Sequence, residues 1–194
     1  ANLSFVKLDF ISRDQTWIPL AVLLIGAFVG MFDDVLEIRG NGGYKAGGLS
    51  LKKRLFVIAG IGFFVSVWFY TKLDITTVSL LWFNNLTIGW LIIPFFTFVI
   101  LSLYASGVID GLDGLSGGVF SSIFAAYALL AFTNGQFNLA ALCASIVGGI
   151  LAFTWFNIPP ARFYMTETGS MALTTTLGVV ALTTDTLGGG KGLS

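Results

Sequence analysis

Six long, mostly apolar stretches occur in this chain, and they constrain its fold more than any other feature. A helix that crosses a lipid bilayer needs about 20 such residues, because each residue adds about 1.5 Å and the hydrocarbon core is about 30 Å thick. The sequence therefore predicts an all-α fold, a polytopic membrane bundle of about six transmembrane helices. The stretches lie near residues 17–36, 51–71, 90–108, 115–133, 138–157 and 169–187.

The composition agrees with a bundle that lies in lipid rather than in water. Of the 194 residues, 56% are hydrophobic and 10% are charged, whereas soluble domains carry roughly 25% charged residues. Ten basic and ten acidic side chains give a formal net charge of zero, so no basic field indicates a nucleic-acid partner. The chain has no histidine, which removes histidine bases and histidine metal ligands from its chemistry. The expected partner is the lipid bilayer.

The links between the stretches predict how the chain is oriented. Residues 37–54 form a Gly-rich, basic loop, and basic loops of membrane proteins favour the cytoplasmic side. The loop holds five of the ten basic residues, which are Arg39, Lys45, Lys52, Lys53 and Arg54. The nearly uncharged link at 72–89 predicts a short β-hairpin that turns at Asn84-Asn85 on the non-cytoplasmic side. No internal repeat or linker divides the chain, so we treat residues 1–194 as a single integral-membrane domain.

Helix parity gathers the acidic residues at the cytoplasmic end. Each span reverses the side of the membrane, so the links near 109–114 and 158–168 are expected on the same side as the basic loop. An unpaired carboxylate at the end of a membrane helix costs about 2–4 kcal/mol, so such acids are usually paired or functional. Hard oxygen ligands favour Mg²⁺, and Mg²⁺ in turn suggests phosphate chemistry. The five carboxylates are Asp33, Asp34, Asp110, Asp113 and Glu167.

Two pairs of acids each allow two interpretations. Asp33 and Asp34 are adjacent, and neighbours on a helix point about 100° apart, so one can face a metal or a nucleophile while the other faces a different partner. The alternative is a solvated helix end at which Asp34 and Glu37 offset Arg39. Asp110 and Asp113 lie three apart on one face of a helix or turn, and the glycines beside them let the backbone approach a ligand. The alternative is a turn that is rich in Asp and Gly for conformational reasons.

The segment 157–170 and the basic loop supply the remaining candidates. The beginning of the last stretch offers free backbone N–H groups to an anion. Glu167 is either a site carboxylate or simply an acid in the first turn of that helix. Tyr164 is either an aromatic of the membrane interface or a platform for a nucleobase. Lys45 and Lys52 either bind a phosphate or serve only the topology of the loop.

These motifs together resemble one family, the polyprenyl-phosphate N-acetylhexosamine-1-phosphate transferases, and within it most closely the MraY-type phospho-N-acetylmuramoyl-pentapeptide transferases. The family shows an Asp-Asp pair that ends a helix, a basic stretch with Gly-Leu-Ser, and an Asp-Gly-Leu-Asp-Gly-Leu signature. These are followed by Asn-x-Pro-Ala and then Phe-Met-Gly-Asp-x-Gly-Ser. In this chain the motifs stand, in the same order, at Asp33-Asp34, Gly48 to Ser50, Asp110 to Leu115, Asn157 to Ala161 and Tyr164 to Ser170.

The resemblance implies a Mg²⁺-dependent reaction at the cytoplasmic face of a bacterial cytoplasmic membrane. Undecaprenyl phosphate attacks the β-phosphorus of UDP-N-acetylmuramoyl-pentapeptide, UMP leaves, and lipid I forms for peptidoglycan synthesis. Glu167 and Asp34 are implied as metal ligands, and Asp33, Asp34 and Glu167 as the catalytic residues. The implied nucleotide- and substrate-binding residues are Asp110, Asp113, Asn157, Tyr164, Lys45 and Lys52.

The chain also departs from the family. Thr166 and Glu167 replace the usual Gly and Asp, and Tyr104 and Gly107 stand where relatives often have Asn. Family members usually carry about ten membrane helices, each of about 20 apolar residues, whereas six such stretches are visible here. We therefore expect further helices before Ala1 and after Ser194 in a longer parent protein, and no activity of this part alone. Family members are often dimers, which leaves a homodimer open.

Three rival functions remain at this point. A sister enzyme transfers N-acetylglucosamine-1-phosphate from its UDP donor to the same lipid. A membrane cation transporter also carries intramembrane acids, although it would place them near the middle of the bilayer rather than at helix ends. An inactive scaffold is the third reading, because Glu167 stands where the family has Asp.

Overall fold

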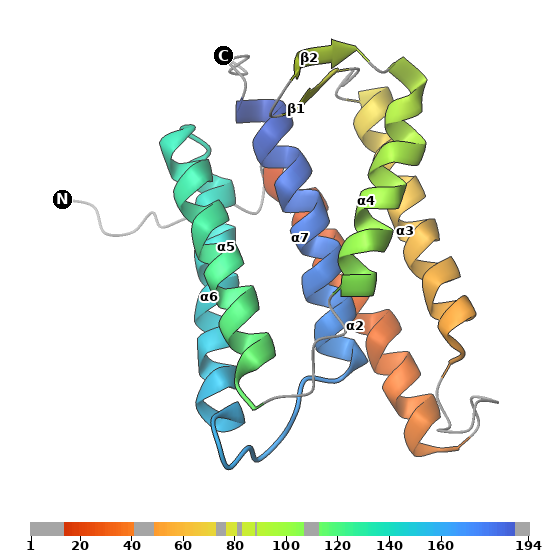
Figure 1. Cartoon of the computed structure of the whole chain (residues 1–194), viewed down its shortest axis with the longest axis vertical. Coiled ribbons are helices and arrows are strands. Elements are labelled where there is room, and N and C mark those ends of the chain that lie inside the picture. The colour runs from red at the N-terminus through yellow and green to blue at the C-terminus, as the bar shows by residue number, and fades with distance from the viewer. Residues whose placement is uncertain are drawn as a thin grey trace, which may run out of the picture.

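The architecture is a bundle of long helices, shown in Figure 1. A computed structural model describes residues 14–40, 49–72, 77–80, 83–87, 89–106 and 113–188. Each of the six helices in these ranges falls on one of the six apolar stretches, which confirms the predicted helical class. They are α2 (Asp14–Ile38), α3 (Leu51–Lys72), α4 (Ile92–Ser106), α5 (Leu115–Thr133), α6 (Phe137–Asn157) and α7 (Glu167–Gly188), with a 3-10 turn η1 (Gly89–Leu91) before α4.

Four of the described helices are long and apolar enough to cross a membrane. α4 is shorter, with 15 residues, and together with η1 it forms the apolar helix Gly89–Ala105. α7 has 22 residues, which is a sufficient length, but it is less apolar than the four. The number of spans among the six helices therefore stays a prediction. The four candidates cover Thr16–Ile38, Leu51–Thr71, Leu115–Thr133 and Phe137–Asn157.

α7 lies in the middle of the bundle, where it packs against α2, α4 and α5 (Figure 1). Every residue from Met171 to Val180 is buried. Four buried threonines of α7 donate their hydroxyl groups to the carbonyl four residues earlier, so these polar groups are satisfied within the helix. Because other helices surround α7, it does not need the apolar surface of a helix that faces lipid. The four are Thr174, Thr175, Thr183 and Thr184.

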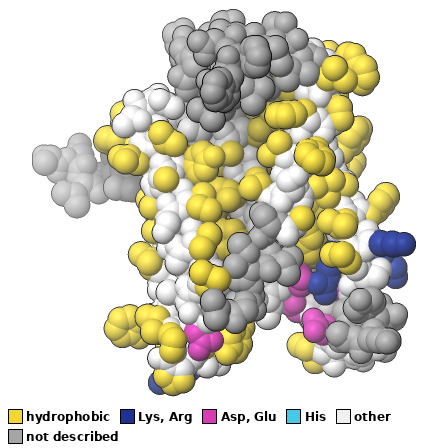
Figure 2. Space-filling view, in the orientation of Figure 1, with side chains coloured by type: hydrophobic (Ala, Val, Ile, Leu, Met, Phe, Trp, Pro, Cys, Tyr) yellow, Lys and Arg dark blue, Asp and Glu magenta, His cyan; other side chains and the backbone are white. Residues whose placement is uncertain are grey.

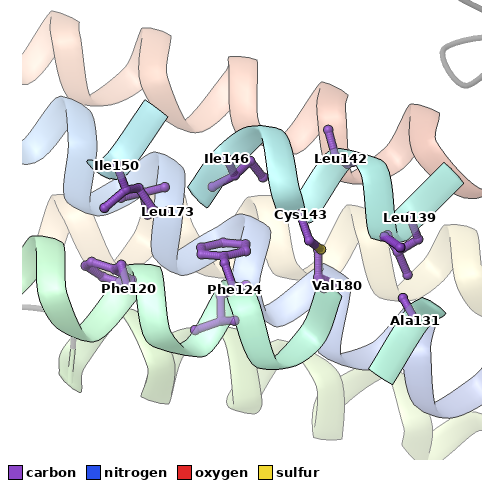
Figure 3. Close-up of a cluster of buried hydrophobic side chains, with 12 residues drawn as sticks. Phe120, Phe124, Ala131, Leu139, Leu142, Cys143, Ile146, Ile150, Leu173 and Val180 are labelled. Atoms are coloured by element: carbon purple, nitrogen blue, oxygen red, sulfur yellow. The ribbon is translucent and has the colours of Figure 1, made fainter. Parts of the chain in front are cut away.

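α7 is also the helix that joins the two halves of the apolar core. Phe120 and Phe124 of α5 pack with Cys143 of α6 and with Leu173 and Val180 of α7 (Figure 3). A second cluster connects another face of α7 to α2, α3 and α4. The position of the first turn of α7 is therefore set from both sides of the bundle.

α2 and α7 approach closely because glycines lie between them. Gly26 and Gly30 stand four apart and so lie on one face of α2. A Cβ atom at Gly26 would lie 3.0 Å from Cα of Ala172, and one at Gly30 would overlap the backbone of Glu167 and Thr168. Small residues at this spacing let helices pack tightly in membranes. The end of α2 that carries the acidic pair consequently touches the beginning of α7.

Two short strands lie at the opposite end of the bundle from that contact (Figure 1). The strands, β1 (Thr77–Leu80) and β2 (Phe83–Thr87), pair antiparallel, with Leu80 opposite Phe83. The turn predicted at Asn84-Asn85 is wrong, because both residues lie within β2. The pairing instead places the connection at residues 81–82, which lie outside the described ranges. The turn preference of Asn is a local effect, whereas register depends on the pairing of both strands over their length.

Candidate active site

Four helices bring polar side chains to one end of the bundle. The acidic end of α2 lies against the first turn of α7, and α3 and α4 each add one side chain. We call this group the α2–α7 cluster. Figure 2 shows acidic and basic side chains at this lower end, while hydrophobic side chains cover most of the described surface above it. The cluster consists of Asp33, Asp34, Arg54, Tyr104, Glu167, Thr168 and Ser170.

Arg54 connects two of the predicted acids. Its Nε lies 2.6 Å from Oδ2 of Asp33, an ion pair without hydrogen-bond alignment, and its Nη1 donates to Oε1 of Glu167. Asp33 is fully buried, and its Oδ1 accepts the N–H of Leu49 at 2.6 Å. A buried charge is costly without a partner, and a planar guanidinium can serve two carboxylates in a fixed geometry. Asp33 and Arg54 therefore hold each other in place.

Asp34 caps the N-terminus of α7 from a different helix. Its Oδ1 accepts the N–H of Glu167 at 3.2 Å, and its Oδ2 accepts the N–H of Thr168 at 3.2 Å and the Thr168 hydroxyl at 2.5 Å. The first N–H groups of a helix have no partner within it, and the helix dipole favours negative charge there. The sequence predicted an anion at this helix start, and the group found there is the Asp34 carboxylate.

The Glu167 carboxylate contacts side chains of two other helices and of its own helix, and it remains partly open to solvent. Besides the bond from Arg54 of α3, its Oε2 accepts the hydroxyl of Tyr104 of α4 at 3.0 Å and that of Ser170 at 3.3 Å. The Glu167 side chain is 17% exposed, whereas Asp33 is fully enclosed. Glu167 is thus held in one orientation at a place that a ligand can reach.

The charges of the cluster do not balance. In their ionised forms, three carboxylates face a single guanidinium among the described residues, which leaves negative charge in excess. Oδ1 of Asp34 and Oε1 of Glu167 each accept one hydrogen bond from the described part of the chain. A carboxylate oxygen offers two lone pairs, so each can accept one more ligand. This surplus favours a cation.

These residues fit Mg²⁺ as a partial donor set. In phosphate-processing sites, Mg²⁺ usually takes one or two protein carboxylates and completes its shell with water and substrate phosphates. Asp34 and Glu167 can provide the two carboxylates. The described ranges contain no group of three or more metal-binding side chains. Among the described residues these two carboxylates are thus the donor set, which water and substrate phosphates would extend.

A second group of contacts, the α5–α6 junction, fastens the link after α6 to the start of α5. Asn157 is fully buried; its Oδ1 accepts the N–H of Gly114 at 2.8 Å, and its Nδ2 donates to the carbonyl of Phe163 at 2.9 Å. Oδ2 of Asp113 accepts the N–H of Ala161 at 3.3 Å. Gly114 has a φ of 79°, which glycine adopts without strain. None of these contacts reaches the α2–α7 cluster.

The other predicted site residues are spread more widely. Tyr164 lies in the link between α6 and α7 with its side chain 55% exposed. Lys52 is exposed in the first turn of α3. Lys45 and Asp110 lie outside the described residues. The structure thus joins Asp33, Asp34 and Glu167 in one cluster and places Asp113 and Asn157 in another.

Sequence reasoning missed Arg54 and Tyr104 as parts of the site. Arg54 was counted only among the basic residues of the loop, although its position one turn after Ser50 places it on α3 itself. Tyr104 was noted only as a departure from the family. Its hydroxyl near the end of an apolar stretch was nevertheless a signal, because a buried tyrosine usually finds a hydrogen-bond partner.

The comparisons with known proteins show the family of this chain. The chain matches Glycosyl transferase family 4 over residues 16–185, a range that contains both groups of contacts, and it belongs to this family. Among its curated relatives are phospho-N-acetylmuramoyl-pentapeptide-transferases of three bacteria. That of Levilactobacillus brevis is 35% identical over 86% of this chain and 51% of its own length. The protein of Wolbachia from Drosophila simulans is 33% identical over 84% of this chain and 50% of its own length. The protein of Pelagibacter ubique is 29% identical over 90% of this chain and 53% of its own length. The chain spans about half the length of these relatives.

Proposed function

We propose that the full-length protein transfers phospho-N-acetylmuramoyl-pentapeptide from its UDP-linked donor to undecaprenyl phosphate. The products are lipid I, for peptidoglycan synthesis, and UMP. The family and the names of the relatives support this class of reaction. The observation that carries the proposal is the meeting of Asp34 and Glu167, 133 positions apart, at the N-terminus of α7 beside Arg54. The excess of carboxylates suits the divalent counter-ion of a pyrophosphate.

The proposed site faces the cytoplasm of a bacterial cell. In this arrangement all six helices span the cytoplasmic membrane, and the two strands lie on the outer side. Arg39, Lys52, Lys53 and Arg54 lie at the end of the bundle that carries the cluster, which supports this orientation under the positive-inside rule. The bilayer and the two substrates are its partners, and a homodimer stays a prediction from the resemblance.

Three residues of the cluster are proposed to contact the substrate or its metal ion, and a fourth positions one of them. Glu167 and Asp34 would hold Mg²⁺, which when bound would supply positive charge against the pyrophosphate. Arg54 adds a second, fixed positive charge next to them, and such prearranged charges stabilise phosphoryl transfer. Asp33 is buried behind Arg54, so we assign it the role of positioning that guanidinium. The catalytic contacts then belong to Asp34, Glu167 and Arg54.

The donor nucleotide is proposed to lie toward the link between α6 and α7. The exposed ring of Tyr164 provides a surface on which uracil can stack. Asp113 and Asn157 set the shape of this link through their backbone contacts, and in this way they determine where Tyr164 stands. Asp110, Lys45 and Lys52 complete the proposed substrate-binding set.

A donor assay on the full-length protein tests the proposal. The purified enzyme is given undecaprenyl phosphate and Mg²⁺, and UMP release is compared between UDP-N-acetylmuramoyl-pentapeptide and UDP-N-acetylglucosamine. We expect turnover with the first donor, and a loss of about 100-fold or more in Glu167→Gln because a charged group at the reacting phosphates is removed. Glu37→Gln is the matched control, since Glu37 is an exposed acid at the end of α2. Turnover with UDP-N-acetylglucosamine alone would reassign the donor, and full activity in Glu167→Gln would refute the metal role.

A further inference from the structure

A pocket of about 380 Å³ opens at the C-terminal end of α6, apart from the α2–α7 cluster. Its wall combines one cationic side chain with five apolar ones, and none of the lining residues is acidic. Figure 2 shows hydrophobic side chains together with acidic and basic ones at the lower end of the half formed by α5 and α6. The lining residues are Trp155, Phe156, Ile158, Pro159, Pro160 and Arg162.

The length of α6 places this pocket at the level of lipid headgroups. α6 has 21 residues, so it is about 31 Å long, close to the 30 Å or so of a hydrocarbon core. Trp and Tyr side chains favour membrane interfaces, and aromatic side chains lie at both ends of the helix. Phe132 and Phe137 form an edge-to-face pair where α6 begins, and Trp155, 75% exposed, lies where it ends. When the beginning of α6 lies at one interface, its end and the pocket lie at the other.

The link after α6 holds the pocket in shape before any ligand binds. The N–H of Arg162 donates to the carbonyl of Phe156 at 2.9 Å, which folds the link back over the end of the helix. The ring of Phe163 stacks on that of Phe156 with centroids 5.5 Å apart, and Asn157 binds the Phe163 carbonyl. A preformed site loses less conformational entropy on binding than a flexible one.

The charge of Arg162 is available to a ligand. Within the described residues, both ion pairs involve Arg54, and no carboxylate lies within ion-pair distance of the exposed Arg162. The nearby Asp113 directs its Oδ2 to the N–H of Ala161 instead. A guanidinium binds phosphate oxygens through two parallel N–H donors. A ligand that matches the pocket therefore carries a phosphate next to an apolar part.

We propose that this pocket binds an anionic phospholipid of the surrounding bilayer. The lipid phosphate lies on Arg162, and the glycerol and upper acyl chain lie against Trp155 and Ile158. Undecaprenyl phosphate also presents both parts at this depth of the membrane, but the pocket shares no residue with the α2–α7 cluster where that substrate is proposed to react, which favours a phospholipid. The inference rests on the pocket and on the span of α6, and it does not depend on the transferase reaction.

Native mass spectrometry of the full-length protein in detergent tests the proposal. The protein is titrated with dioleoyl phosphatidylglycerol, and the dissociation constants of variants are compared. Loss of the guanidinium in Arg162→Gln is expected to weaken binding about tenfold, and Trp155→Ala is expected to weaken it several-fold through the lost apolar wall. Lys53→Gln is the matched control, because Lys53 is an exposed cation at the same end of the bundle but outside the pocket.

Two results would overturn the inference. The first is equal affinity of the wild type and Arg162→Gln for phosphatidylglycerol, provided that both unfold at the same temperature before lipid is added. The second is displacement of bound phosphatidylglycerol by UMP, which would assign the pocket to the nucleotide. The experiment measures lipid binding and not UMP release, so it tests the pocket even if the proposed transferase reaction is not observed.

Discussion

The α2–α7 cluster and the α5–α6 junction lie at the same end of the bundle but use polar residues in different ways. In the cluster, Asp33, Asp34 and Glu167 contact a guanidinium and hydroxyl groups as well as backbone N–H groups, and negative charge is in excess. In the junction, Asp113 and Asn157 bond to backbone groups of nearby segments. The cluster can therefore attract a charged ligand, whereas the junction holds the backbone of the chain in place.

The largest expected effect on stability comes from removing the guanidinium of the α2–α7 cluster. Arg54→Gln leaves the fully buried Asp33 without its cationic partner, and we expect a loss of about 3–5 kcal/mol in the free energy of unfolding. Reversible unfolding of the full-length protein in mixed micelles measures it. Arg39→Gln, at an exposed position, is expected to stay within about 0.5 kcal/mol. Similar small changes in both variants would show that Arg54 does not organise the cluster.

The glycine contact that brings the cluster together gives the next effect. A methyl group in Gly30→Ala would overlap the backbone of Glu167 and Thr168, and backbone yields less readily than side chains. We expect a loss of about 3 kcal/mol, together with reduced activity, because Asp34 and the start of α7 move apart. Gly148→Ala, where the added Cβ meets open space, is the control and is expected to retain stability. Equal melting temperatures for the two variants would contradict the close α2–α7 contact.

The junction is expected to respond more weakly and in a different parameter. Asn157→Ala leaves the N–H of Gly114 and the carbonyl of Phe163 without their partner, at a cost of about 2 kcal/mol in stability. Because the link is loosened while the cluster stays intact, we expect KM for the nucleotide donor to rise more than kcat falls. The exposed Asn134 provides the control Asn134→Ala. A fall in kcat at unchanged KM would show that Asn157 takes part in the chemistry.

The smallest expected effects come from the two hydroxyl groups that donate to Oε2 of Glu167. Tyr104→Phe removes the hydroxyl that donates to Oε2 at 3.0 Å, and Ser170→Ala removes a longer bond of 3.3 Å to the same oxygen. We expect each to cost about 1 kcal/mol or less, with the larger loss of activity in Tyr104→Phe. Steady-state UMP release compares them. A larger loss in Ser170→Ala would reverse the assigned order of the two contacts.

Much of the fold could be predicted because a long apolar stretch is a local property of the chain. The stretch at 115–133 coincides with α5, and the stretch at 169–187 falls within α7. The environment of each helix could not be predicted in the same way. The threonines of α7 lower its hydropathy, yet this helix is the most enclosed part of the described structure because other helices surround it.

The candidate site was predictable in its location and less so in its contacts. Counting membrane crossings predicted that Asp33, Asp34 and Glu167 lie at one end of the bundle, and the three residues meet in the α2–α7 cluster. Parity cannot tell which side chains touch, because that depends on helix rotation and on the distance between helices. The insertion of Arg54 between Asp33 and Glu167 was therefore not foreseen.

The sequence by itself determined which segments become helices, because the spacing and length of apolar residues act within each segment. Only the tertiary structure decided that Asp34 caps a helix 133 positions away, that Arg54 joins Asp33 to Glu167, and that Asn157 closes a separate junction. The physical reason is the range of the interactions. Burial and helix formation depend on near neighbours in the chain, whereas hydrogen bonds and ion pairs require atoms from distant segments to lie within about 3 Å of one another.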